Sequence, residues 1–422
     1  MKKALLLDTS IGTSNVGDNI IMECVEKELA PILANMFVFH LPTHVPAFHS
    51  YAIWRNSVAV QNYATCDYKF IGGSNILAKN MLTHYPQWNV NIFNCKPLAN
   101  SVCIGVGAGA GERTDAYTTH LYRKILSHSY YHSVRDERSK RYVEDVLGLQ
   151  AINTGCVTMW ALTPNFCAQI PAKKANNVVF TLTARTQVDP RDQMLIDTLK
   201  REYDHVSFWV QGDKDETYFN MFSNTDGIEV IPPHKAAYEA VLMRNNIEYV
   251  GTRLHGGIYA LRHKKRAIII SIDERARSIS ADTGLITIEK DTLDELPSLI
   301  NSTFETRLNI PFNEIARWKA QFEGKYMESI WIKEIKADRN CVTYHLDVLE
   351  GLVRYFSPGC EMFAEFGFDI SNIPKSVLAV PVLSNIMQFA WLFDCLVWIE
   401  EVDQQFYECL PQIKRGFQEM YR

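Results

Sequence analysis

The chain has 422 residues, of which 47% are hydrophobic and 22% charged, as in a soluble globular protein with room for two or three domains. Its net charge of −5 gives no general attraction to nucleic acid, so we expect no nucleic-acid partner. The ten cysteines include no Cys-x-x-Cys pair, which argues against a zinc site and a disulfide framework and suits a reducing cytoplasm. The apolar run after Lys2 and Lys3 is too short for a signal peptide.

In the first half of the chain, apolar runs typical of buried strands alternate with helical patterns. The expected strands are Lys3–Asp8, Tyr68–Gly73, Ser101–Gly109 and a run from His132 that turns helical at about Asp136. A loop rich in glycine and asparagine, Ser10–Asn19, leads from the first strand to a helix near Ile20–Ala30.

The second half repeats this alternation. Its expected strands are Asn176–Ala184, His205–Gly212, Ile247–Thr252 and Arg266–Asp273. Continuous apolar strands separated by helices predict an α/β protein whose parallel sheets are covered on both faces. The polar segment Ile170–Asn177 indicates a linker, so we expect domains at residues 1–172 and 173–310.

Residues 311–422 have an almost entirely helical pattern and form an expected C-terminal extension. The apolar stretch Val377–Ile399 resembles a membrane span, but polar residues such as Asp394 interrupt it. We expect a buried or interface helix that packs on the first domain or on a second copy of the chain. A peripheral membrane contact is the alternative.

The segment Tyr249–Ala276 carries the strongest functional signal. Arg253 and His255 stand where a strand passes into a helix, and Arg275 and Arg277 follow the next strand. Ligands bind at the carboxyl ends of parallel strands. An imidazole surrounded by guanidinium groups suits a small, multiply charged anion that needs proton transfer.

Three loops of the first half supply further candidates for lining the site. The loop before the first helix contains Asn15, Gly17 and Asp18, and Asp18 either orients a hydroxyl or caps the helix. Gly73, Asn75 and Gly107 lie in glycine-rich strand ends that lack the dinucleotide fingerprint, which disfavours a nicotinamide site.

Other polar groups follow neighbouring strands. Arg135 reaches an anion or pairs with Asp136 to shape a turn, while Arg185 and Gln211 follow strands of the second half. Cys156 would need a nearby base to act as a nucleophile, and the sequence shows none. Histidines such as His44 occur in no recurring spacing, and we expect them to be structural or exposed.

Four motifs occur in a fixed order: "NVGDN", "GGSN", "SVRDERS" and "GTRLHGG" followed by "SIDERA". Together they resemble the polysaccharide pyruvyl transferase family over about residues 1–305. The resemblance implies two Rossmann-like domains facing a cleft, as in GT-B glycosyltransferases. It also implies transfer of the enolpyruvyl carbons of phosphoenolpyruvate to two sugar hydroxyls as a cyclic ketal, without nicotinamide or flavin.

The resemblance further implies roles for particular residues. Arg135 and Arg253 match arginines that bind phosphoenolpyruvate, His255 matches the histidine used in catalysis, and Asp18 matches an acidic residue on the acceptor side. Many members have lysine at Arg275, and arginine keeps the charge but is a poor proton donor. In the strand-end loop that contains Cys156, the family more usually has an Asp-Pro pair, which this sequence lacks.

These expectations define an enzyme that uses no metal and no cofactor and takes a sugar or lipid-linked oligosaccharide as acceptor. We expect it in the cytoplasm, at the inner face of the membrane if the acceptor is lipid-linked, and as a monomer or homo-oligomer. Two alternatives stay open. One is a nucleotide-sugar glycosyltransferase of the same architecture, and the other is a non-catalytic glycan-binding protein.

Overall fold

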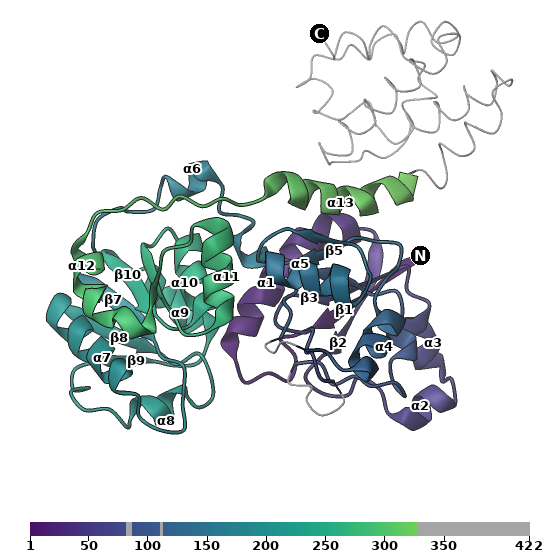
Figure 1. The fold of residues 1–422 in the computed structure, drawn as a ribbon, viewed down its shortest axis with the longest axis horizontal. Helices are drawn as coiled ribbons and strands as arrows, with labels where there is room; N and C mark the ends of the chain where they lie inside the picture. The colour runs from purple at the N-terminus through teal and green to yellow at the C-terminus, as the bar shows by residue number, and fades with distance from the viewer. Residues whose placement is uncertain (82–86, 110–112, 328–422) are drawn as a thin grey trace, which may run out of the picture. The chain divides into compact units, whose positions relative to one another are not determined.

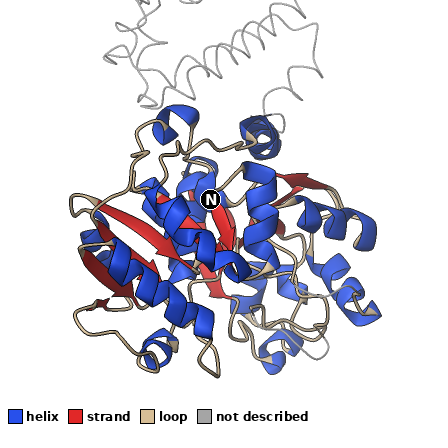
Figure 2. Ribbon diagram, turned by 60° about the vertical axis from the view of Figure 1, so that its left-hand side comes forward, coloured by secondary structure: helices blue, strands red, loops and turns tan. Residues whose placement is uncertain are grey.

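A computed structural model describes residues 1–81, 87–109 and 113–327 of the chain (Figure 1). Residues Met1–Phe322 form one compact unit. This unit contains two parallel sheets with helices packed against them (Figure 2), which confirms the predicted α/β class.

The first sheet has the strand order β2-β1-β3-β4, and all its pairings are parallel. Its strands are β1 (Lys2–Asp8), β2 (Met36–Pro42), β3 (Tyr68–Gly72) and β4 (Val102–Ile104). The parallel pair β5 (His132–Val134) and β6 (Ala151–Asn153) extends it, because Val106, just after β4, bridges Val134. Its helices are α1 (Val16–Leu33), α2 (Ser50–Trp54), α3 (Val58–Ala64), α4 (Ala116–Ile125), α5 (Glu137–Arg141) and α6 (Pro164–Cys167).

The second sheet has the order β12-β11-β10-β7-β8-β9 and is also parallel throughout. Counted from β7, this is the 3-2-1-4-5-6 order of the Rossmann fold, with its switch point between β7 and β10. The strands are β7 (Asn177–Thr181), β8 (His205–Trp209), β9 (Glu229–Ile231), β10 (Ile247–Gly251), β11 (Ala267–Ser271) and β12 (Thr287–Glu289). The helices are α7 (Pro190–Glu202), α8 (Asp215–Phe219), α9 (Lys235–Leu242), α10 (Leu254–Arg262), α11 (Glu274–Thr283) and α12 (Leu296–Asn301).

Alternating residues of the central strands enter different hydrophobic clusters. In β1, Ala4 and Leu6 belong to one cluster and Leu5 and Leu7 to another, so both faces of the strand are buried. The cluster that contains Ala4 continues through α1 and α10, which contact each other, to β10 and β11 of the second sheet. One continuous apolar core therefore joins the two sheets.

The expected linker Ile170–Asn177 falls between α6 and β7, the first strand of the second sheet. Helix α13 (Phe312–Met327) begins the expected extension and packs on the first sheet. Its Trp318 and Phe322 contact the Phe70 ring of β3, and the Trp318 indole donates to the Tyr131 carbonyl at 2.8 Å. The start of the extension is thus part of the core, as predicted for packing on the first domain.

Strands β2, β6, β9 and β12 are not among those predicted. They are short or only half buried, and therefore lack the long apolar run that indicates a central strand. The apolar stretch Val377–Ile399 lies outside the described residues. Among the helices that the structure does describe, none has the length and apolar character needed to cross a membrane.

Candidate active site

The loop from β10 into α10 lies at the carboxyl end of β10, as predicted for Arg253 and His255, and β10 is one of the two strands at the switch point of the second sheet. Arg253 is the N-cap residue of α10, and no side chain caps this helix. The first-turn N–H groups of a helix carry partial positive charge and bind anions. The start of α10 therefore offers an anion site next to His255.

Arg253 is paired with an acidic residue that the sequence analysis overlooked. Its guanidinium group hydrogen-bonds both carboxylate oxygens of Asp215, and Nε also donates to the Leu182 carbonyl at 3.1 Å. Asp215 is completely buried, whereas 20% of the Arg253 side chain is exposed. The sequence places Asp215 four residues after Gln211 in a polar loop, which gives no sign of this pairing.

His255 is buried, and its Nε2 atom lies 3.7 Å from the Cys156 sulfur. Burial, together with the positive charges of Arg275 and Arg135, lowers the pKa of His255 to about 3, while Asp273 opposes this shift. The imidazole is therefore neutral near pH 7. The sequence shows no base near Cys156, but the structure places His255 beside it.

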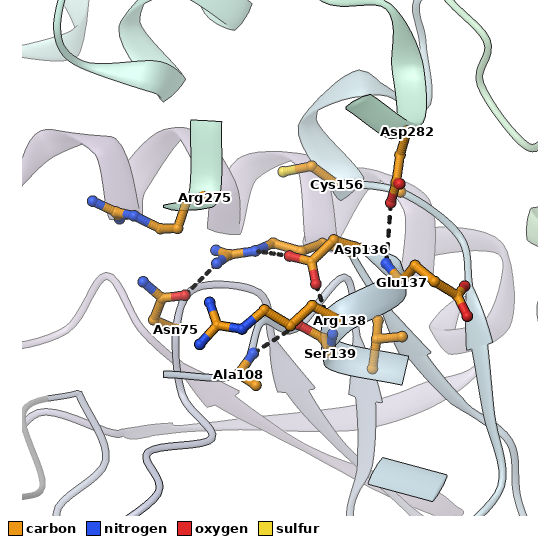
Figure 3. A network of polar contacts seen from close by, with 12 residues as sticks. Asn75, Ala108, Asp136, Glu137, Arg138, Ser139, Cys156, Arg275 and Asp282 are labelled. Atoms are coloured by element: carbon orange, nitrogen blue, oxygen red, sulfur yellow. Dashed lines mark hydrogen bonds and ion pairs between the residues drawn. The ribbon is translucent and has the colours of Figure 1, made fainter. Parts of the chain in front are cut away.

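Arg135 follows β5 and is only 2% exposed. Its guanidinium hydrogen-bonds the Asn75 side chain and, at 3.2 Å, Asp136 (Figure 3). It also lies flat against Gly107, where a Cβ atom would stand 2.3 Å from its Cζ. Burial lowers the pKa of Arg135, and the nearby Arg275 charge adds to that effect. An anion bound here would offset both the burial of the Arg135 charge and its repulsion by Arg275.

Asp136 has the turn-shaping role considered for it. Its carboxylate caps α5 by accepting from the Ser139 N–H at 2.7 Å while it pairs with Arg135. The same carboxylate fixes the turn and orients the guanidinium, while the binding of an anion by Arg135 stays a prediction.

Arg275 joins this group from the second sheet. It follows Asp273, the N-cap of α11, and its Nε donates to that carboxylate at 2.8 Å. Its side chain is 39% exposed, and no hydrogen bond or ion pair joins it to the other residues drawn in Figure 3. Its charge lowers the pKa of both His255 and Arg135. The charges of arginines from both sheets thus act on His255.

Two predicted arginines lie elsewhere. Arg277 pairs with Glu289 and Glu274 on the surface, and Arg185 lies 3.7 Å from Asp189 with 43% of its side chain exposed. The ion pairs of both side chains are with these local carboxylates. Their role in lining the site stays a prediction.

Asp18 does not cap α1, because the Asn15 side chain accepts from the Gly17 N–H in that role. Asp18 is 3% exposed and accepts from the Thr13 hydroxyl at 2.7 Å. Burial raises its pKa, whereas the Thr13 hydrogen bond and the His44 charge lower it. His44 Nε2 lies 3.8 Å from the Asp18 carboxylate and has no hydrogen-bond partner among the described residues. His44 is therefore a site residue that the sequence analysis classed as structural or exposed.

Asn15 and Gln211 join the two halves of the compact unit. Gln211 Nε2 donates to Asn15 Oδ1 at 2.9 Å, and the Val16 N–H donates to the Gln211 carbonyl, also at 2.9 Å. A Cβ atom at Gly17 would stand 2.7 Å from Gln211 Nε2, so glycine at this position serves the close approach of the two halves. Asn15 and Gln211 lie near the site because they hold the halves together.

Gly73 has a backbone φ of +55°, and a Cβ atom there would lie 2.2 Å from the Ile21 side chain. Its absence of a side chain permits the turn after β3 that leads to Ser74 and Asn75. Gly73 and Gly107 thus position the polar groups of the site by making room for protein atoms.

The family is decided by the sequence between the first helix and the start of α11. A family model described as polysaccharide pyruvyl transferase matches residues 15–274, more than half of the chain. The chain belongs to this family. The matched region contains Asp18, Arg135, Cys156, Arg253 and His255, and it ends one residue before Arg275. Membership in the polysaccharide pyruvyl transferase family makes group transfer the class of activity.

No curated protein matches the sequence significantly. Solved structures similar to the chain include Methanocaldococcus jannaschii UDP-GlcNAc 2-epimerase, with 12% identity, a TM-score of 0.45, and 77% of this chain and 100% of that one covered. S. aureus MnaA bound to UDP has 12% identity and a TM-score of 0.46, with 78% of this chain and 98% of that one covered. The lipopolysaccharide outer core galactosyltransferase WaaB has 10% identity and a TM-score of 0.40, with 79% of this chain and 100% of that one covered.

Proposed function

We propose that this pyruvyl transferase family member transfers the enolpyruvyl carbons of phosphoenolpyruvate to two hydroxyls of a sugar, which forms a cyclic pyruvate ketal. One observation carries the proposal. The positive charges of Arg135 from the first sheet and Arg275 from the second both act on a neutral, buried His255 at the uncapped start of α10. Phosphoenolpyruvate carries a carboxylate and a phosphate, which need such a group of cations.

The reaction proceeds through protonation of the methylene carbon of phosphoenolpyruvate, which leaves an oxocarbenium-like carbon. One sugar hydroxyl attacks this carbon, phosphate leaves, and a second hydroxyl closes the ring. Of the two hydroxyl protons, one replaces the proton given to the methylene carbon and the other leaves with phosphate. Arg135 and Arg275, with the exposed part of Arg253, stabilise the charge that develops on the departing phosphate.

Binding of the donor changes the electrostatic surroundings of His255. Negative charge beside Arg135 and Arg275 offsets the two cations that lower the pKa of His255. Asp18 and His44 lie together on the side of the first sheet, and we assign the sugar acceptor to them. A buried carboxylate whose pKa is raised is a suitable base for a hydroxyl.

The acceptor in this proposal is a sugar or a lipid-linked oligosaccharide, used in the cytoplasm for polysaccharide synthesis. A lipid-linked acceptor would place the enzyme at the inner face of the membrane. An acceptor panel that contains free glycosides and glycosides on short lipid carriers separates the two classes, because the preferred class gives the faster phosphate release.

The deciding experiment measures phosphate release from phosphoenolpyruvate with a panel of glycosides, followed by mass analysis of the product. Phosphate that appears only with an acceptor, together with a pyruvate ketal product, supports the proposal. Turnover of a nucleotide sugar with indifference to phosphoenolpyruvate would identify a glycosyltransferase. Glycan binding without phosphate release would identify a non-catalytic protein.

We expect activity to survive exhaustive chelation, because arginines supply the positive charge that a metal provides in other phosphoryl sites. Among the described residues, Asp8, Glu26 and His40 have ligand-like spacing, but His40 already lies 3.1 Å from Asp8 as an ion pair. The measurement compares phosphate release before and after chelation, with Glu26→Gln as a second control. Activity that vanishes on chelation and returns with magnesium contradicts the scheme.

A further inference from the structure

Cys156 contacts the candidate catalytic histidine across the boundary between the two halves of the compact unit. It follows β6 of the first sheet and is 2% exposed, and His255 belongs to α10 of the second. Its sulfur is 3.7 Å from His255 Nε2 and 3.1 Å from the Thr158 hydroxyl, which is itself buried. The thiol is therefore held between a hydroxyl and an imidazole nitrogen.

The chemistry of these three groups sets the direction of the hydrogen bonds. A hydroxyl is a stronger donor than a thiol, and an imidazole lone pair is a stronger acceptor than either oxygen or sulfur in this set. The Thr158 hydroxyl therefore donates to Cys156, and the Cys156 thiol donates to His255 Nε2. This order leaves the single proton of the neutral imidazole on Nδ1.

Charged groups from each neighbouring element surround the pair. Arg135 follows β5, Arg275 and Asp273 stand at the start of α11, and Arg262 of α10 hydrogen-bonds Cys24 of α1 near the Thr158 carbonyl. Negative charge on Cys156 would interact favourably with Arg135, whose pKa it raises. A thiolate formed at Cys156 would thus have cations close to it.

We propose that Cys156 is a positioning residue that acts through His255 as a proton relay in the proposed pyruvyl transfer. The inference rests on the proposed function and deepens it. The neutral imidazole gives its Nδ1 proton to the methylene carbon of phosphoenolpyruvate while Nε2 takes the thiol proton. His255 thereby donates a proton without first becoming an imidazolium ion.

The relay returns to its starting state in each turnover. After the first step, the π electrons of phosphoenolpyruvate have formed the new C–H bond, Cys156 is a thiolate, and His255 carries its proton on Nε2. The attacking sugar hydroxyl then gives its proton to Nδ1, and Nε2 returns its proton to the sulfur. The second hydroxyl proton leaves with phosphate, so protons and electrons balance.

The first test compares the turnover of Cys156→Ala and Cys156→Ser with that of the wild type. We expect phosphoenolpyruvate binding within about twofold by calorimetry, and turnover that falls on the order of a hundredfold in both variants. Serine preserves the hydroxyl-type hydrogen bonds but is a much weaker acid than a thiol. The pH–rate profile should differ from that of the wild type in both variants. Cys167→Ala is the matched control, because it removes another buried thiol, whose hydrogen bond goes to the Leu162 carbonyl.

The second test reads the tautomer of His255 by nitrogen NMR on labelled protein without substrate. We expect the wild type to carry its proton on Nδ1 and Cys156→Ala to shift toward the Nε2 form. A wild-type proton on Nε2, or a Cys156→Ala variant with wild-type turnover and pH profile, overturns the relay. A wild-type protein that releases no phosphate from phosphoenolpyruvate contradicts the proposed function. The tautomer measurement still tests the hydrogen bond from Cys156 to His255 independently of activity.

Discussion

Replacing His255 with asparagine should lower turnover by about a hundredfold or more and leave phosphoenolpyruvate binding largely intact. A positioned acid or base contributes about this factor. Asparagine fills similar space and still accepts a hydrogen bond from Cys156, but it cannot carry a proton from Nδ1. The measurement is phosphate release under saturating donor, combined with calorimetric binding of phosphoenolpyruvate.

His263→Asn is the matched control, because His263 caps the other end of α10 and bonds the Tyr259 carbonyl. It should keep wild-type turnover. A His255→Asn enzyme with near wild-type rate would show that His255 is structural, and so would a variant that simply unfolds.

The same substitution should also change how stability depends on pH. Folded His255 has a pKa of about 3, whereas an unfolded histidine titrates near 6.5. Between these values the unfolded chain binds the extra proton, so the free energy of unfolding falls as the pH drops from about 6.5 toward 3. His132, with a pKa of about 4, acts in the same direction and remains in the variant. Denaturant unfolding at several pH values should therefore show a shallower loss for His255→Asn.

Replacing Arg253 with alanine should destabilise the fold by about 3–5 kcal/mol, because it leaves the completely buried Asp215 carboxylate without its partner. The double substitution Arg253→Ala with Asp215→Asn removes the stranded charge and should recover part of the loss. Urea unfolding of both variants measures this difference. Arg185→Ala is the matched control, since that arginine is exposed and should have little effect.

The double variant also separates donor binding from folding. If Arg253 contacts phosphoenolpyruvate through its exposed part, the folded double variant should still bind the donor about thirtyfold more weakly, the equivalent of about 2 kcal/mol. Wild-type affinity in that variant would assign Arg253 a purely structural role. A single variant as stable as the wild type would instead refute the importance of the buried pair.

The sequence by itself determined the α/β class and the carboxyl-end position of the main candidate residues. Continuous apolar runs such as Ala267–Ser271, alternating with helical patterns, predict central parallel strands, and the structure buries this strand completely. A residue that directly follows such a strand, as Arg135 and Arg253 do, must stand at the ligand-binding edge of its sheet. The order of the motifs added the family without any knowledge of side-chain positions.

Only the tertiary structure decided which of these side chains meet. Asp18 and His44 are 26 residues apart along the chain, and Cys156 and His255 are 99 apart, so no local spacing links either pair. The same limit applies to Arg277, which stands two residues from Arg275 yet pairs with Glu289 on the surface. The position of a residue directly after a predicted strand determines the edge of the sheet at which it lies. Its partner depends on helix packing between the two sheets, because α1 and α10 share one apolar core and thereby set the distance between groups far apart in the chain.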